Sequence, residues 1–275
     1  MSTLSELEAG SVLLVGAGKM GMAMARGWMA AGLAPLALTL VDPKPFPEVV
    51  AETARWGVTL ASRLPATPPR VVVLAVKPQV MTEVLAEVRS VCGPDTLVVS
   101  VAAGISLAAL AEGTGSERVV RAMPNTPAQI GKGITGAIAG SGVGPADRDI
   151  ADALMSAAGP VEWFEAEAMI DAVTAVSGSG PAYVFHLVEA LAAAGEAQGL
   201  SPVQAMALAR QTVIGAAALM ELDPAPAGRL RENVASPGGT TAAALAVLMD
   251  PETGLAPLMA RAVAAARKRS EELGR

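Results

Sequence analysis

The chain has 275 residues, of which 52% are hydrophobic, 17% charged and 3% aromatic, with a formal net charge of −6. Such a length fits one large or two moderate domains with a substantial core, and this composition excludes intrinsic disorder and argues against nucleic-acid binding, which needs clustered Lys and Arg or aromatic platforms. A single cysteine, Cys92, and a single histidine, His186, leave no material for an internal disulfide or for a metal site built on Cys or His ligands.

Residues 1–166 alternate short apolar runs with helix-compatible stretches. The apolar runs predict strands at residues 11–15, 36–41, 70–76, 96–101, 118–123, 134–139 and 161–164. Helices are predicted between them at residues 19–31, 47–56, 79–91 and 146–158. Continuous apolar strands separated by helices are typical of a parallel sheet covered on both faces. The first domain is therefore expected to be α/β, with a Rossmann-type parallel sheet.

A glycine-rich turn joins the first predicted strand to the first helix. Residues 16–21, Gly-Ala-Gly-Lys-Met-Gly, match the G-x-G-x-x-G fingerprint in the strand–helix context that it requires. Gly16 makes the tight turn, Gly18 lets a pyrophosphate approach the backbone, and Gly21 lets the helix pack closely on the strand. Lys19 and Met20 begin the helix, whose N-terminus offers backbone N–H groups to phosphates. The turn predicts dinucleotide binding.

The second predicted strand is followed by Asp42. An acidic residue there usually hydrogen-bonds the ribose 2′-hydroxyl and so favours NAD over NADP. Lys44, two residues later, would instead attract a 2′-phosphate, and both side chains would also suit a solvated loop. The sequence predicts NADPH or NADH as cofactor and leaves the choice between them open.

Two further segments follow strand ends, where doubly wound sheets bind ligands. Ala75, Val76, Lys77 and Pro78 are expected to form a wall of the cofactor pocket, although Lys77 would equally suit solvent. Asn125 would hydrogen-bond the nicotinamide or its ribose. The alternative for Asn125 is a turn held by this side chain and its neighbouring prolines.

The residue pattern changes from alternating strands and helices to helices alone after residue 166. Helices rich in Ala, Leu and Met are predicted at residues 181–198, 202–221, 227–233, 241–249 and 254–273, without a strand signal. The domain boundary is placed at residues 166 and 167, so that residues 167–275 form an all-helical second domain. An Ala-rich helical domain with so few charges is a natural dimerisation surface.

A mean hydropathy of +0.46 requires either a membrane or extensive burial between subunits. The longest charge-free runs, residues 172–188 and 233–249, are interrupted by Pro and Gly and fall short of the roughly 20 apolar residues of a spanning helix. Glu6 and Glu8, without Lys or Arg near them, do not fit a secretory signal. The sequence predicts a cytoplasmic homo-oligomer that binds neither membrane nor nucleic acid.

Several motifs in fixed order identify a family. They are the glycine turn, residues 75–78 (AVKP), residues 121–127 (RAMPNTP) with 131–133 (GKG), residues 171–183 (DAVTAVSGSGPAY) and residues 236–241 (SPGGTT). This set closely resembles pyrroline-5-carboxylate reductase from about residue 11 to about residue 273. The resemblance implies a helical domain that intertwines two subunits, in homodimers or pentamers of dimers. It also implies reduction of 1-pyrroline-5-carboxylate, a cyclic imine, to L-proline with NADPH or NADH.

The last motif suits a substrate carboxylate. Gly238 and Gly239 permit unusual backbone angles, so that successive N–H groups can face one concavity. Thr240 or Thr241 then starts a helix and adds the positive end of its dipole. By resemblance, Ser236, Gly239 and Thr241 would contact the carboxylate, and the Thr241 hydroxyl would contact the imine nitrogen as the catalytic group. A helix cap after a Pro-Gly turn is the purely structural alternative.

The nearest rival enzyme is a β-hydroxyacid dehydrogenase, which is similar around the glycine-rich segment that opens the interdomain helix. That group places a catalytic Lys four residues after the last glycine, where this chain has Val184, and no Lys lies between Lys132 and Lys268. A reductase of another cyclic imine and a non-catalytic NAD(P)H-binding sensor on the same fold would also fit the sequence. Turnover rather than binding distinguishes an enzyme from a sensor.

Overall fold

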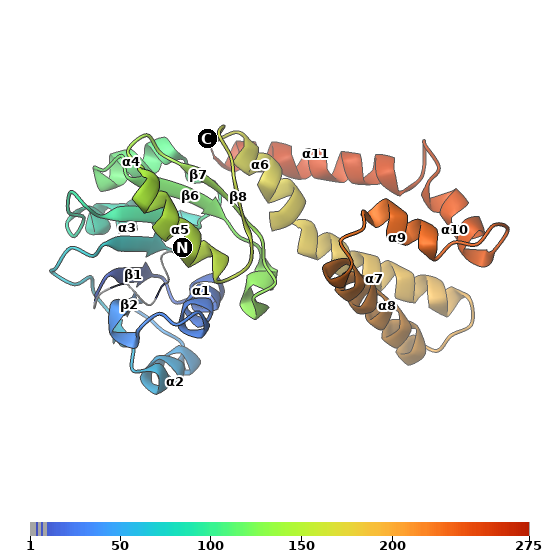
Figure 1. Cartoon of the computed structure of the whole chain (residues 1–275), viewed down its shortest axis with the longest axis horizontal. Helices are drawn as coiled ribbons and strands as arrows, with labels where there is room; N and C mark the ends of the chain where they lie inside the picture. Colours follow the sequence, from blue (N-terminus) through green and yellow to red (C-terminus); the bar gives the residue numbers. More distant parts are fainter. Residues whose placement is uncertain (1–3, 5–6, 8–9, 275) are drawn as a thin grey trace. The chain divides into compact units, whose positions relative to one another are not determined.

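The computed structural model describes residues 4, 7 and 10–274, and the chain packs into two compact units (Figure 1). The sheet unit comprises Met1–Ser179 together with Ala266–Arg275, and the helical unit comprises Gly180–Ala265. The predicted boundary at residues 166 and 167 lies just after the last strand. Helix α6 (Met169–Val173) follows that boundary and packs on strands of the sheet unit.

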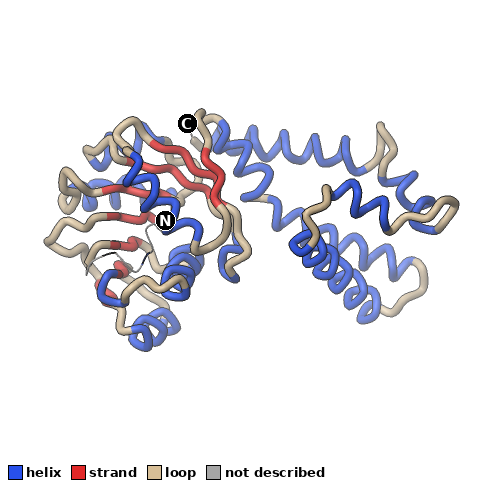
Figure 2. Tube along the Cα trace, in the orientation of Figure 1, coloured by secondary structure: helices blue, strands red, loops and turns tan. Residues whose placement is uncertain are grey.

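The sheet unit is built on one sheet, coloured red in Figure 2. Its eight strands among the described residues have the order β3-β2-β1-β4-β5-β6-β7-β8. Their bounds are Val12–Val15, Leu38–Val41, Thr59–Ala61, Val71–Leu74, Leu97–Ser100, Val119–Met123, Thr135–Ala139 and Val161–Trp163 in chain order from β1 to β8. The sequence analysis missed the short edge strand β3.

The predicted parallel sheet is confirmed with one exception. Strand β7 pairs antiparallel to β6, and every other neighbouring pair is parallel. The connection from β6 to β7 holds only the short 3₁₀ turn η4 (Thr126–Ile130). A parallel neighbour needs a crossover of about a dozen or more residues, usually helical, so this connection returns the chain in the opposite direction.

Both faces of the sheet are covered. Val12 and Leu14 of β1 face a core shared with α1 (Lys19–Ala30), α2 (Pro47–Trp56) and α5 (Pro145–Ser156). The alternate residues, Leu13 and Val15, face a second core. That core is shared with α3 (Met81–Arg89) and α4 (Leu107–Thr114), the latter absent from the sequence prediction. Strands buried on both faces explain why the sequence shows continuous apolar runs rather than alternation.

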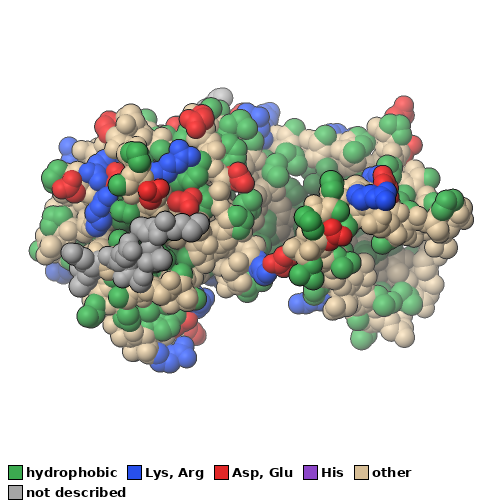
Figure 3. Space-filling view, in the orientation of Figure 1, with side chains coloured by type: hydrophobic (Ala, Val, Ile, Leu, Met, Phe, Trp, Pro, Cys, Tyr) green, Lys and Arg blue, Asp and Glu red, His purple; other side chains and the backbone are tan. Residues whose placement is uncertain are grey.

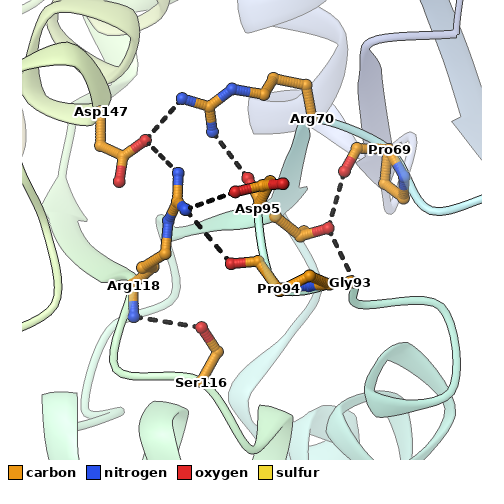
Figure 4. Close-up of polar contacts among 9 residues, drawn as sticks. Pro69, Arg70, Gly93, Pro94, Asp95, Ser116, Arg118 and Asp147 are labelled. Atoms are coloured by element: carbon orange, nitrogen blue, oxygen red, sulfur yellow. Dashed lines mark hydrogen bonds and ion pairs between the residues drawn. The ribbon is translucent and has the colours of Figure 1, made fainter.

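A charged cluster lies at the N-terminal ends of the central parallel strands (Figure 4). Asp147, in the first turn of α5, is buried and accepts hydrogen bonds from Arg70 Nη2 at 2.6 Å and Arg118 Nη2 at 2.8 Å. Arg70 precedes β4, and Arg118 precedes β6 and also contacts Asp95 at 3.2 Å. Burial raises the pKa of the Asp147 carboxyl, but the hydrogen bonds and charges of the two arginines outweigh burial and hold this pKa below its usual value.

The helical unit is all α, as predicted. Its helices are α7 (Gly180–Ala197), α8 (Pro202–Leu222), α9 (Ala227–Asn233), α10 (Thr240–Leu248) and the first part of α11 (Leu255–Leu273). A capping box between Ser201 and Gln204 starts α8. Helix α7 has no cap of its own, because α6 runs into it through the π-helical turn Thr174–Gly178.

The helical unit has almost no core of its own. Helices α7 and α8 pack together, but the buried side chains between them are the alanines Ala192, Ala205 and Ala209. Large apolar side chains of both helices are exposed in the single chain, and Figure 3 shows green apolar surface on the visible face of this unit. They include Val184, Phe185, Leu187, Leu191, Val203, Leu208, Ile214, Leu219, Met220 and Leu222.

An apolar surface of this size is expected to be buried, either in a membrane or against another subunit. By length and composition, α8 would also suffice to cross a membrane. However, α8 is one of two packed helices whose exposed apolar residues continue from one helix to the next, and a surface of this extent is typical of an obligate subunit interface.

The first prediction concerns Asp147. Replacing Asp147 with Asn leaves two guanidinium groups facing one another without their shared carboxylate. We expect a loss of about 2–3 kcal/mol in the free energy of unfolding, between the values for exposed and fully buried ion pairs. Urea unfolding measures it. Asp149→Asn, an exposed change on the same helix, is the matched control and should stay within about 0.5 kcal/mol of the wild type.

The effect of Asp147 should depend on pH. Because its folded pKa is depressed, the carboxylate contributes fully above its unfolded pKa and loses that contribution as the pH falls through the lower, folded value. The stability gap between the wild type and Asp147→Asn should be constant near neutral pH and shrink below about pH 4. A gap that persists unchanged into strong acid would show that the pairing with the arginines is not its source.

The second prediction concerns self-association. The wild-type chain should sediment as a dimer or larger at micromolar concentration, with a melting temperature that rises with protein concentration. Phe185→Asp on α7 should lower both the assembled fraction and the melting temperature, because it places a charge in the apolar surface. Leu36→Asp, at an equally exposed apolar position of the sheet unit, is the control and should change neither. A stable wild-type monomer would contradict the interface argument.

Candidate active site

Two glycines of the fingerprint are required by packing. Gly16 has a φ of +97°, and its N–H donates to the Val41 carbonyl at 2.8 Å. A Cβ on Gly16 would lie 2.8 Å from the Ala75 carbonyl oxygen, and one on Gly21 would collide with the Gly16 carbonyl. The turn therefore lies against both β4 and α1 more closely than any side chain permits.

Gly18 differs, because its Cβ would meet nothing. No atom lies within 4 Å of the position a Cβ would take, and its φ of −72° suits any residue. Gly18 is the N-cap of the twelve-residue α1, without a side-chain cap. Protein packing thus gives no reason for glycine here, whereas a ligand at the helix N-terminus does. This open cradle, facing orphan N–H groups, fits a dinucleotide pyrophosphate.

Asp42, which was predicted to bind the cofactor, lies beside the glycine turn. It follows β2, and its Oδ2 accepts a hydrogen bond from the Ala17 N–H of the glycine turn at 3.0 Å. Its Oδ1 accepts from the Lys44 N–H at 2.8 Å. Asp42 lines a pocket of about 380 Å³ with Gly16 and Val76.

The same pocket contains residues that the sequence analysis missed. Ser62 and Arg63 follow β3, and Glu83 belongs to α3; all three line the pocket with Asp42. The only sequence signal for Ser62 and Arg63 was the strand β3, which has three residues and was not predicted.

The other residues predicted to bind the cofactor differ in their exposure to solvent. Ala75 contacts the glycine turn, whereas Lys77 and Pro78 are exposed where the 3₁₀ turn η3 (Pro78–Val80) begins. Lys19 is exposed at the start of α1, and Met20 packs against the core. The side chains of Lys19 and Lys77 thus reach solvent, and Met20 offers the site its backbone.

Asn125 is held by the protein itself. Its Nδ2 donates to the Ser177 carbonyl at 3.1 Å, and its Oδ1 accepts from the Ile134 N–H at 3.0 Å. The side chain is buried and links the end of β6 to the π-helical turn and to the start of β7. Each polar end of the amide makes one bond in this link, as the turn-holding alternative expects, and each keeps a second hydrogen-bonding position.

The candidate substrate loop belongs to the helical unit. Gly238 has a φ of +70°, and the Gly239 N–H donates to the Ser236 carbonyl at 3.0 Å. A Cβ on Gly239 would collide with the Ser236 hydroxyl oxygen. Gly239 is the N-cap of α10 without a side-chain cap, so Thr240 and Thr241 are its first two residues. The first N–H groups of α10 therefore have no side-chain cap and are available to an anion at this loop.

The structure thus gathers Gly16, Gly18, Gly21, Asp42, Ala75 and Val76 at one edge of the sheet unit, and Ser236 to Thr241 in one loop of the helical unit. Over residues 4, 7 and 10–274, no group of three or more His, Cys, Asp or Glu side chains is arranged to hold a metal ion.

Two family models match the chain. A model described as pyrroline-5-carboxylate reductase dimerisation matches residues 167–273, and one described as NADP oxidoreductase, coenzyme F420-dependent, matches residues 11–104. The pyrroline-5-carboxylate reductase of Pisum sativum is 38% identical over 261 residues, covering 94% of each chain. The chain belongs to the pyrroline-5-carboxylate reductase family.

Solved structures of similar proteins support the same family. The pyrroline-5-carboxylate reductase of Coxiella burnetii is 34% identical, with a TM-score of 0.89, and the match covers 98% of this chain and 100% of that one. The pyrroline carboxylate reductase of Plasmodium falciparum, solved with NADP bound, is 28% identical, with a TM-score of 0.80 over 98% and 99% of the two chains.

Membership of the pyrroline-5-carboxylate reductase family confirms several sequence predictions. The chain is an NAD(P)-dependent oxidoreductase with a Rossmann-type domain that takes NADPH or NADH. Its helical part is a dimerisation domain, and the chain forms a homodimer. The residue assignments within the two sites stay predictions.

The third prediction tests the open cradle. Gly18→Val should weaken NADH and NADPH binding at least about tenfold, because the side chain fills the space left for the pyrophosphate. Its melting temperature should stay close to that of the wild type. Gly21→Ala is the contrasting variant and should lower the melting temperature, because its methyl group collides with the Gly16 carbonyl. Fluorescence titration and thermal unfolding measure both; unchanged affinity in Gly18→Val would remove the cradle from the cofactor site.

Proposed function

We propose that this chain reduces 1-pyrroline-5-carboxylate to L-proline, the last step of proline biosynthesis, with NADPH or NADH as hydride donor. The observation that carries the proposal is full-length likeness to reductases of this name, supported by the open glycine turn before α1 in one domain and the uncapped glycine loop before α10 in the other. A sensor that had lost catalysis would have no need of the second feature.

The reaction asks little acid–base chemistry of the protein. The bound cofactor supplies a hydride, which adds to the carbon of the cyclic C=N bond. A pyrroline imine is protonated near neutral pH, so its nitrogen already carries the proton that the product amine keeps. The protein then has to position the imine, exclude competing orientations and offer a hydrogen-bond partner to nitrogen. A site without histidine or cysteine is suited to this task.

The loop before α10 offers groups that can position both the substrate carboxylate and the imine nitrogen. The N–H groups of Thr240 and Thr241, at the positive end of the helix, suit the substrate carboxylate, and the Ser236 hydroxyl and the Gly238–Gly239 backbone complete the concavity. We assign the Thr241 hydroxyl to the imine nitrogen. A Thr hydroxyl is too weak an acid to protonate an imine alone, so its oxygen accepts a hydrogen bond from the iminium N–H and orients the ring.

We also propose the higher assembly and the location. The apolar, weakly charged surface of the helical unit supports further association of homodimers, with a pentamer of dimers as the form suggested by the family motifs. A single half-buried cysteine, Cys92, suits a reducing compartment, which supports a cytoplasmic location.

A spectrophotometric assay tests the proposed function. Purified protein is mixed with 1-pyrroline-5-carboxylate and either NADPH or NADH, and both nicotinamide oxidation and proline formation are followed. Proline formed in step with cofactor oxidation is the expected result. Turnover only with a six-membered cyclic imine would assign a different substrate, and cofactor binding without any turnover would assign a sensor.

The fourth prediction concerns Thr241. Thr241→Val removes the hydroxyl at nearly constant volume and should lower kcat/KM for the imine about 10–1000-fold, the range for removal of one positioned hydrogen-bond partner. Cofactor affinity should not change. Thr241→Ser keeps the hydroxyl and should recover most of the activity, which separates chemistry from packing. Equal turnover in Thr241→Val and the wild type would remove Thr241 from the mechanism.

A further inference from the structure

Arg121 is a buried cation in an otherwise apolar part of the sheet. It belongs to β6, where Val119, Val120 and Ala122 are also buried, and it is only 6% exposed. Its Nη1 donates to Glu167 Oε1 at 2.8 Å, but its buried Nε has no hydrogen-bond partner among the described residues. An apolar side chain would pack here without the cost of desolvating a guanidinium. Packing of the sheet therefore does not explain this arginine, and its role lies in the groups that it holds.

Arg121 holds α6 and the residues that lead into it. Glu167 lies two residues before α6, and its Oε1 also accepts from the Leu107 N–H at the start of α4 at 2.8 Å. Asp171 lies inside α6, and its Oδ1 is 4.0 Å from Arg121 Nη2. One guanidinium thus attracts two carboxylates, and its rigid, planar set of donors fixes the direction in which they lie.

Asp171 extends these contacts to the last helix of the chain. Its Oδ1 accepts a hydrogen bond from the Ser270 hydroxyl of α11 at 2.6 Å. Within α11, which the structure describes in full, Ser270 is the one buried residue. The Leu273 carbonyl oxygen lies 3.2 Å from the position that a Cβ on Gly104 would take. A charge-assisted hydrogen bond and a close backbone contact therefore dock the end of α11 on the sheet unit.

These contacts lie at both places where the chain passes between its two units. It leaves the sheet unit after Ser179, where α6 runs through the π-helical turn into α7, and it returns at Ala266, within α11. The glycine turn belongs to the sheet unit, and the candidate substrate loop before α10 belongs to the helical unit. Groups that hold α6 and the end of α11 therefore hold both covalent connections between the two candidate sites.

We propose that Arg121 is a positioning residue for hydride transfer. It fixes α6 directly and the end of α11 through Asp171, and so limits the movement of the substrate-binding unit against the cofactor-binding unit. Hydride transfer is sensitive to such movement, because a displacement of about 1 Å can cost about 100-fold in rate. The proposal rests on the proposed function only in using imine reduction as the measure of hydride transfer.

Hydrogen exchange tests the chain of contacts without any substrate. Arg121→Met removes the donors of Arg121 at similar side-chain length. We expect the backbone amides of residues 266–273 to exchange at least about fivefold faster than in the wild type, although Arg121 contacts α6 and the residue before it rather than α11. Ser270→Ala, which removes the last bond, should have the same effect. Faster exchange in α6 alone, or no change, in Arg121→Met would overturn the role of Asp171 as the link.

A matched control comes from the same turn of α11. Arg269→Met removes an exposed ion pair with Glu272, in which the two side chains are 66% and 44% exposed. Such pairs contribute little, so exchange of residues 266–273 and turnover should both stay within about twofold of the wild type. An effect of Arg269→Met as large as that of Ser270→Ala would assign the result to general fraying of α11 and overturn the proposal.

Single-turnover kinetics with the imine measures the effect on catalysis. Arg121→Met should slow oxidation of bound NADPH or NADH at least about tenfold and Ser270→Ala at least about threefold, while cofactor dissociation constants stay within about twofold. Arg121→Lys keeps a cation beside Glu167 and should recover part of the rate. If Arg121→Met does not fold, Ser270→Ala and Arg121→Lys decide. An unchanged rate in Ser270→Ala, or an equal loss of cofactor affinity, would overturn the positioning role.

The two measurements fail separately. A wild-type protein that does not reduce the imine would contradict the proposed function, whereas the exchange of residues 266–273 would still decide whether Arg121 holds α11. A wild-type protein that reduces the imine, with turnover insensitive to Ser270→Ala, would keep the proposed function and overturn the role of Arg121 in positioning.

Discussion

The approach of Gly16 to the Ala75 carbonyl fixes the geometry of the cofactor edge. A side chain at Gly16 or Gly21 would push α1 away from β1 and β4. With both contacts in place, α1 starts beside the carboxyl ends of the central strands, and its N-terminus faces the open space at Gly18. The turn also brings the Ala17 N–H to Asp42 and so links the ends of β1 and β2. The positions of the α1 N-terminus and of Asp42, the groups expected to bind phosphate and ribose, thus depend on one close backbone contact.

The two units gain their stability in different ways. The sheet unit buries aliphatic side chains on both faces of its sheet and closes the opposite edge with Asp147 and its arginines. The helical unit buries three alanines between α7 and α8 and leaves its larger apolar side chains to the partner subunit. A partner subunit on this surface would add the apolar burial that the helical unit lacks as a single chain. The candidate substrate loop before α10 lies in the same unit.

Local signals predicted most of the fold and the cofactor edge. Strands such as β1 and β4 are continuous apolar runs, and Gly16 and Gly21 are required by packing. Features decided by tertiary contacts were missed. Strand β3 has three residues and is held by pairing with β2, and the direction of β7 is set by a connection too short for a crossover. One hydrogen bond of Asn125 reaches Ser177, 52 residues away, so the motif alone left open whether its side chain holds a turn or contacts the cofactor.

The scarcity of histidine and cysteine, one of each in the chain, is consistent with the chemistry. An imine that is protonated in water brings its own proton, so the protein needs fixed dipoles rather than a titrating group near neutral pH. Helix N-termini supply such dipoles at both candidate sites: α1 begins at Gly18, where the cofactor pyrophosphate is expected, and α10 begins after Gly239, where the substrate carboxylate is expected. Since backbone N–H groups do not titrate, binding of both anions should persist across a wide pH range. The pH dependence of turnover should then follow protonation of the imine rather than of any protein group.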